Sequence, residues 1–176
     1  GLNVRHSPAI DNDRTAMFTV ENLINNDDTN ENTTGNGNAI ARYVQRTVTL
    51  ADGQDAEDLK VFITAYKPST ANIKLYVKLL NGEDGESIDD RTWLELTQTT
   101  SSTVVSDSEN RDDFREFEYG IPTASLTGAG GQVQYTTSAG VTYTGFKYFK
   151  IKAVLLSTSS SIVPRVTDFR AIALQI

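Results

Sequence analysis

The sequence predicts an all-β protein: an antiparallel β-sandwich, jelly-roll-like, with a polar, loop-rich N-terminal segment. Three observations lead to this fold class. Apolar residues recur at every second position over most of the chain, Gly, Pro, Asn and Asp gather between the apolar runs, and no long stretch carries the 3.6-residue period of a helix. A series of short strands separated by such turns is typical of sandwiches and jelly rolls.

The chain divides into an N-terminal segment, residues 1–40, which we expect to be partly docked, and a β-sandwich domain, residues 41–176. Asn25 to Asn38 reads NNDDTNENTTGNGN and contains no apolar side chain. Ordering a backbone costs roughly 1–2 kcal/mol per residue, and polar side chains bury too little surface to offset it, so we predict a long exposed loop. AMFTVENLI (Ala16–Ile24) precedes it and predicts a docked strand or short helix. Phe18 and Val20 on one face favour the strand.

Three segments after residue 41 alternate most clearly. In RYVQRTVTL (42–50), Val44, Val48 and Leu50 share a face that Arg46 interrupts. DLKVFITAY (58–66) and NIKLYVKLL (72–80) alternate without interruption, and the second should be the clearest half-buried strand. The apolar positions of these two on one face are Leu59, Val61, Ile63 and Ala65, and Ile73, Leu75, Val77 and Leu79.

The remaining strands are shorter or follow turn signals. Short candidates are WLEL (93–96), FREFEYG (114–120), QVQYTT (132–137) and VTYTGF (141–146). A longer strand puts Phe149, Ile151, Ala153 and Leu155 on one face, and a last strand is expected around residues 169–176. Pro164 has no N–H for a ladder and belongs at a strand start or on an edge. Ser157 to Ser161 favour a turn.

Composition excludes several classes of function. The chain has 176 residues, no cysteine and a net charge of −7. It therefore has no thiol catalysis, cysteine metal site or disulfide framework. Scattered basic residues on an acidic chain argue against nucleic-acid binding, and no apolar run approaches the ~18 residues of a membrane span. Because the chain begins with Gly1 and its only methionine is Met17, we expect a fragment of a longer polypeptide.

Residues suited to catalysis are few, and we predict that the protein is not an enzyme, with no catalytic residue, cofactor or metal. His6 is the only histidine and lies in a polar segment without the partners of a triad. The adjacent carboxylates Asp89–Asp90 and Asp112–Asp113 would point to opposite sides of extended backbone, so they are poor acid–base pairs. We interpret them as parts of solvated turns.

Other motifs leave alternatives open. EDGESIDD (83–90) and SDSENRDD (106–113) are dense in oxygen ligands, so calcium is an alternative there, although neither matches an EF-hand loop. TGAGGQ (127–132) lacks the Lys-Ser/Thr of a phosphate loop and predicts a hairpin tip. Asn32 begins a glycosylation sequon, which has meaning only in a secretory context. Trp93 and the seven tyrosines could form a sugar platform, or fill the core.

Two long stretches, ARYVQRTVTLADGQDAEDLKVFITAYKPSTANIKLYVKLL (41–80) and YFKIKAVLLSTSSSIVPRVTDFRAIAL (148–174), with DDRTW (89–93) between them, carry a family resemblance. They resemble structural proteins of T4-like tailed phages of the cyanophage type. The resemblance extends from about Ala16 to the C-terminus, more loosely over residues 97–144. It implies a virion component of the contractile tail or baseplate, and it brings no catalytic motif.

On this basis we predict a non-enzymatic virion module, assembled in the host cytoplasm, that acts through contacts with other virion proteins and with copies of itself. The alternative is a receptor- or glycan-binding jelly-roll domain of a tail fibre that touches a host surface glycan. Neither nucleic acid nor membrane is an expected partner, and the binding residues are unknown. Four side chains on nominally outward strand faces could meet a neighbouring subunit or be covered within the chain: Phe62, Tyr66, Tyr76 and Leu80.

Overall fold

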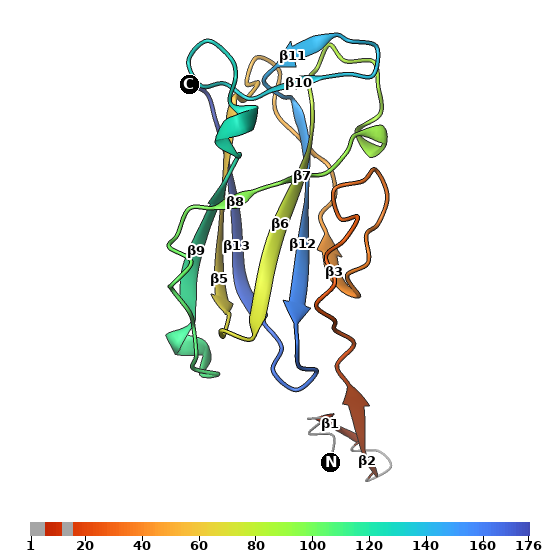
Figure 1. Ribbon diagram of the computed structural model, residues 1–176, viewed down its shortest axis with the longest axis vertical. Helices are drawn as coiled ribbons and strands as arrows, with labels where there is room; N and C mark the ends of the chain where they lie inside the picture. The colour runs from red at the N-terminus through yellow and green to blue at the C-terminus, as the bar shows by residue number, and fades with distance from the viewer. Residues whose placement is uncertain (1–5, 12–15) are drawn as a thin grey trace.

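The protein consists mainly of two antiparallel β-sheets packed face to face (Figure 1). The computed structural model describes residues 6–11 and 16–176, with side chains from residue 22 onward. The first sheet has the strand order β3-β12-β6-β7, with β4 also paired to β12, and the second has the order β13-β5-β9-β8. The prediction of an all-β, antiparallel, sandwich-like fold is confirmed.

The strands have the following bounds. The first sheet contains β3 (Ala41–Val44), β4 (Val48–Thr49), β6 (Ala71–Leu80), β7 (Leu94–Glu95) and β12 (Tyr148–Ser157). The second contains β5 (Asp58–Tyr66), β8 (Thr97–Gln98), β9 (Arg115–Gly120) and β13 (Arg165–Leu174). Two separate hairpins are β1 (His6–Asp11) with β2 (Ala16–Glu21), and β10 (Gln134–Thr136) with β11 (Thr142–Thr144). Short 3₁₀ turns are η1 (Ile88–Asp90), η2 (Arg111–Asp113) and η3 (Thr123–Ser125).

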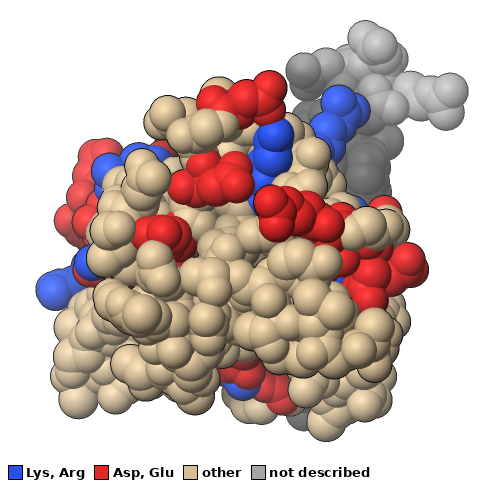
Figure 2. Space-filling view, turned by 90° about the horizontal axis from the view of Figure 1, so that it is seen from above, with Lys and Arg blue, Asp and Glu red and all other residues tan. Residues whose placement is uncertain are grey.

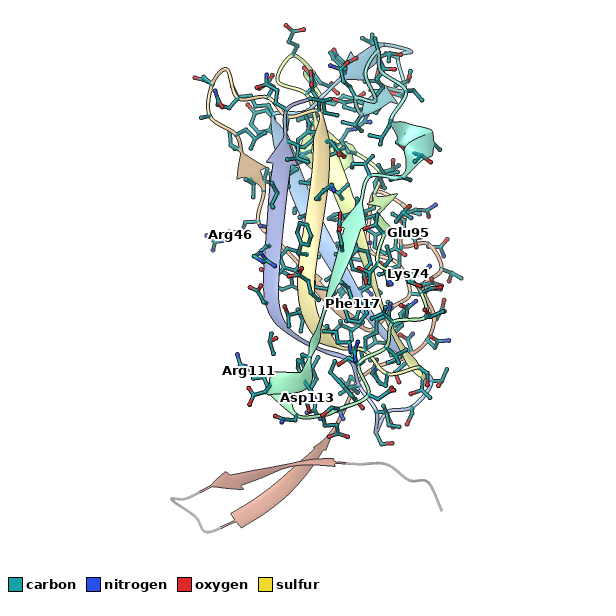
Figure 3. All side chains as sticks on the ribbon, turned by 90° about the vertical axis from the view of Figure 1, so that its left-hand side faces the viewer. Arg46, Lys74, Glu95, Arg111, Asp113 and Phe117 are labelled. Atoms are coloured by element: carbon teal, nitrogen blue, oxygen red, sulfur yellow. The ribbon has the colours of Figure 1, made fainter. Side chains whose placement is uncertain are left out.

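The core lies between the two sheets, where the predicted apolar faces meet. The alternate residues of β5 and β6 named above are all buried there, together with Phe149 and Ile151 of β12. Phe117 and Tyr119 of β9 complete the core, and Figure 3 labels Phe117 beside this strand. Pro164 directly precedes β13, as predicted.

The first sheet is covered on its outer face as well, which corrects the expectation that β6 is half-buried. Tyr76, Lys78 and Leu80 point away from the main core and are nevertheless buried. Tyr76 and Trp93 form a second apolar cluster with Ala39, Val154 and Leu156. Of the four outward side chains in question, Tyr66, Tyr76 and Leu80 are thus covered within the chain. Phe62 is half-buried beneath the guanidinium of Arg170, 5.4 Å from the ring centroid.

The cover over this outer face is residues 22–40, which we call the strap. The prediction of an exposed loop holds for residues 32–36 but is wrong for Glu31, whose side chain is 1% exposed. Lys152 Nζ, fully buried on β12, donates to Glu31 Oε2 and to the Glu31 carbonyl, each at 2.7 Å. Lys152 also lies 4.8 Å from the ring centroids of both Tyr76 and Trp93. A buried charge requires such partners. Glu31 on the strap and Lys152 on the sheet therefore each neutralise the buried charge of the other.

Further lysines of the same face fasten the strap at both sides of Glu31. Lys74 Nζ lies 2.6 Å from an Asp28 carboxylate oxygen and 3.0 Å from Glu95 Oε1. Figure 3 shows Lys74 and Glu95 together on this side of the molecule. Lys78 Nζ donates to the Thr34 carbonyl at 2.9 Å and to the Asp89 carbonyl at 2.6 Å. Lys74 and Lys78 of β6 and Lys152 of β12 therefore hold the polar part of the strap on these two strands, although that part has no apolar side chain.

The third alternating segment, RYVQRTVTL, is not one strand. It is divided into β3 and β4 by residues 45–47, and Val44 is 39% exposed, on the opposite side from the core. Val48 and Leu50 do pack against the core. The break between β3 and β4 at Gln45 lies on the side of the sandwich that is open.

Three tyrosines should make the fold sensitive to alkali. Burial raises the pKa of Tyr76 to about 12 and raises the pKa values of Tyr119 and Tyr135 as well. Above pH ~10 the unfolded chain ionises these phenols before the folded chain does, so the free energy of unfolding should fall as pH rises from there. Tyrosinate absorbance and circular dichroism, followed together, should show a late ionisation step coincident with unfolding. Tyr119→Phe should shrink that step, and complete ionisation near pH ~10 of a chain that stays native would contradict the assignment.

Candidate interaction surface

One side of the sandwich is open. On the opposite side, the chain crosses from β7 to β8 through the buried Leu96 and links the two sheets. On the open side each sheet ends in an edge strand, β3 in the first and β13 in the second, and neither pairs further within the described part of the chain. Some inward side chains at these edges therefore stay partly exposed, namely Tyr43, Leu155, Val166 and Phe169, whereas Ile63, Ile73 and Leu75 behind them are buried.

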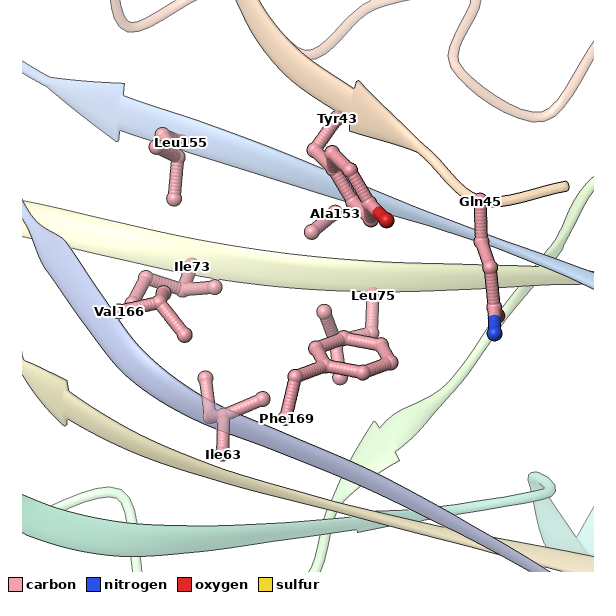
Figure 4. A pocket seen from close by; sticks show the side chains of 9 residues that line it. All are labelled: Tyr43, Gln45, Ile63, Ile73, Leu75, Ala153, Leu155, Val166 and Phe169. Atoms are coloured by element: carbon pink, nitrogen blue, oxygen red, sulfur yellow. The ribbon is translucent and has the colours of Figure 1, made fainter.

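An apolar cleft of about 420 Å³ occupies this opening (Figure 4). Its walls come from both sheets and from the break after β3. The lining residues are Tyr43, Gln45, Ile63, Ile73, Leu75, Ala153, Leu155, Val166 and Phe169. Tyr43 and Val166 stand at the mouth with 59% and 37% of their surface exposed. Apolar side chains left open between two sheets are the kind of surface that a partner covers.

The register explains why these two side chains face the cleft. Tyr43 pairs with the inward-facing Ala153, whereas its neighbour Val44 pairs with Lys152 and points outward. Val166 pairs with the buried Ala65. A register shift between Val166 and Asp168 then separates it from the rest of β13. Beyond that shift Ile172 pairs with Lys60 on the outer face.

The outer face of β13 is charged. Arg170 forms ion pairs with Glu116 and, at 3.1 Å, with Asp168, and Arg165 lies 3.3 Å from Glu109. Charged side chains and a bulge are common devices that keep edge strands from indiscriminate pairing. The cleft side of the same strand is apolar. A partner strand that pairs with β13 must therefore present polar residues on the outer face and apolar residues on the cleft side.

Gln45 supplies a polar feature at the cleft. Its side-chain Oε1 is buried and accepts no hydrogen bond within the described residues, although its backbone N–H donates to Ile151 O at 2.8 Å. A buried acceptor without a donor costs free energy that an added donor would recover. The cleft thus offers an acceptor for an incoming N–H group.

The predicted acidic candidates do not converge. The side chain of His6 lies outside the described residues. Asp89 of η1 contacts Lys150 of β12 at 2.9 Å, and Asp113 of η2 accepts from Ser108 Oγ at 2.7 Å. The two turns lie toward opposite ends of the sandwich (Figure 1). The Lys150 ammonium lowers the pKa of Asp89, which favours the ionised form expected of a solvated turn. Seen from one end, the acidic side chains lie in several separate groups (Figure 2).

In both loops considered for calcium, protein groups already bind some of the carboxylates. In residues 83–90, Glu86 pairs with Arg91 at 3.2 Å and Asp84 accepts from the Tyr135 hydroxyl at 2.7 Å. In residues 106–113, Glu109 pairs with Arg165 at 3.3 Å. Across the residues that the structure describes, no three His, Cys, Asp or Glu side chains are grouped so as to hold a metal ion. Nor does any helix in this part of the chain have the length and apolar character to cross a membrane.

Trp93 is only 6% exposed, so it belongs to the second apolar cluster and offers no exposed sugar platform. The sequon residue Asn32 is exposed on the strap. Residues 127–132 form a turn, but the prediction of a hairpin tip is wrong, because β9 and β10 on either side of it do not pair with each other. The cleft itself was not among the sequence predictions. The sequence holds no local signal for it, because Tyr43 and Gln45 line the cleft only where β3 becomes an edge of its sheet.

Comparisons with known proteins add no identification: no protein-family model, no curated protein and no solved structure matches this chain.

Proposed function

We propose that this protein is a non-enzymatic structural module of a phage virion, in the tail or baseplate, that acts through protein–protein contacts. The observation that carries the proposal is the open side of the sandwich, where an apolar cleft lies between two unpaired strand edges. Such an edge is a template for pairing with another chain. The virion assignment rests on the family resemblance of residues 41–80 and 148–174.

The chemistry of the cleft supports a contact surface. The lining side chains are apolar apart from the Tyr43 hydroxyl and the Gln45 amide, so no described carboxylate, histidine or lysine lines the cleft. General acid–base catalysis needs a titratable group within reach of the substrate. The acidic loops elsewhere already bind lysine, arginine or tyrosine partners. A glycan-binding role has no comparable support, since Trp93 is buried.

Immunogold electron microscopy tests the assignment. Antibodies raised against the purified chain should label the tail or baseplate of T4-like cyanophage particles that carry it. The same antibodies should detect the chain by immunoblot in gradient-purified particles. A chain that is abundant in infected cells but absent from purified particles would overturn the virion role.

A glycan array with the purified chain addresses the fibre-domain alternative. We expect no reproducible binding. Specific binding that is lost when exposed tyrosines are replaced by alanine would favour the alternative over a structural module.

A further inference from the structure

The two strands of the N-terminal hairpin pair with no other described strand. Within the described residues β1 and β2 pair only with each other, from His6↔Glu21 to Asp11↔Ala16. An isolated two-stranded hairpin is at best marginally stable in water. Figure 1 shows the hairpin beyond the end of the sandwich, so residues 16–21 form a strand, as predicted, but the prediction that it docks on the sandwich is wrong. The hairpin needs a further strand or a surface to become stable.

The apolar cleft lies beside a strand edge to which a further strand could be added. The second sheet ends at β13, which lines the cleft through Val166 and Phe169, and no described strand pairs with the free edge of β13. A strand added to β13 would lie across the cleft mouth. Its alternate side chains would enter the cleft beside Tyr43 and Val166, and a donor from it could reach the unsatisfied Oε1 of Gln45.

The sequence of β2 matches that position. AMFTVE places Ala16, Phe18 and Val20 at alternate positions, which gives a strand with one wholly apolar set of residues. The charges also complement each other. The strands of the hairpin carry Asp11 and Glu21 and neither lysine nor arginine. At the cleft, the exposed Arg46 directly follows Gln45, which is one of the lining residues.

In Figure 1 the hairpin projects from the end of the sandwich and does not lie along β3 or β13. The strap that follows β2 begins at Asn22, whose Nδ2 donates to Ser160 O at 3.0 Å, and is then held on the outer face by Asp28 and Glu31. The strap thus anchors the hairpin at the end of the sandwich (Figure 1). A neighbouring copy can place its own hairpin on the open side without releasing its strap.

We propose that β2 of one copy adds to the free edge of β13 in a second copy and fills the apolar cleft. This inference rests on the proposed structural role and names the contact by which copies assemble. The contact is heterologous, because the hairpin of one copy meets the cleft of the next. Repetition therefore gives a closed ring or an open filament.

Introduced cysteines test the contact directly, since the chain has none of its own. Chains carrying Phe18→Cys and chains carrying Val166→Cys, mixed under mild oxidation, should form a mixed disulfide dimer. Phe18→Cys mixed with Ile172→Cys is the matched control and should form several-fold less, because Ile172 lies on the outer face of the same strand. Predominant self-cross-linking of Val166→Cys would overturn the proposal in favour of β13–β13 pairing.

Sedimentation velocity of the full chain supplies an independent measurement. We expect self-association that rises with concentration and weakens by about tenfold or more in Tyr43→Asp and Val166→Asp, because a carboxylate would be buried without a partner. Val44→Asp and Ile172→Asp carry the same change at 39% and 44% exposed positions on the outer faces and should associate normally. A chain that stays monomeric at every concentration overturns this contact, whereas the virion role is decided separately by immunogold labelling.

Discussion

Glu31→Ala should lower the free energy of unfolding by about 3–5 kcal/mol, the cost typical of breaking a buried ion pair from one side. The change leaves the Lys152 ammonium fully buried with the Glu31 carbonyl as its remaining oxygen partner, and burial already lowers the pKa of Lys152. It also removes Oε1, which accepts from the buried N–H of Ala39 at 2.9 Å. Urea unfolding followed by circular dichroism measures the loss.

Two further variants distinguish the contribution of the buried ion pair to stability from that of other strap contacts. Asp28→Ala removes a partly exposed partner of Lys74 in the same segment and should cost about 0.2–1 kcal/mol. Glu31→Leu combined with Lys152→Met removes both charges and should recover most of the stability, as replacement of buried ion pairs by apolar residues often does. A cost below about 1 kcal/mol for Glu31→Ala would mean that the strap does not dock as described.

The strap shows where sequence reasoning failed and why. Fourteen residues without an apolar side chain predict exposure, and residues 32–36 are exposed. Glu31 is buried because Lys152, 121 positions away on β12, requires a counter-charge. No local pattern encodes that pairing. Lysines at outward positions of β6 and β12 would ordinarily indicate a solvated face, which is how Lys74 and Lys78 of NIKLYVKLL appear in the sequence.

The strand faces, by contrast, were predictable because alternation is a local property. The core contains the alternate apolar residues that a period of two predicts, four in residues 59–65 and four in residues 73–79. The cleft was not predictable for the opposite reason. It depends on which strands become the edges, β3 and β13, and on the interruption at Gln45. Edge position follows from long-range pairing, which alternation in a single segment does not specify.

The strongest test of the two-sheet core is Phe117→Ala, which should lower the free energy of unfolding by about 3–5 kcal/mol. Phe117 is fully buried on β9, pairs with Ile63 of β5, and lies 5.1 Å below the ammonium of Lys67. Truncation removes the transferred apolar surface and leaves a cavity that the rigid sheets can fill only partly. Thermal and urea unfolding of the variant measure the effect.

Phe62→Ala is the matched control, because it deletes the same ring one strand away on the opposite face. Phe62 pairs with Glu118 and is half-buried, so its loss should cost only about 1 kcal/mol. Arg170 still retains its pairs with Glu116 and Asp168 in that variant. Equal costs for the two phenylalanines would contradict the assignment of faces. Since Tyr43 and Val166 are placed at the cleft by the same alternation, the result would also remove the basis for the contact between copies.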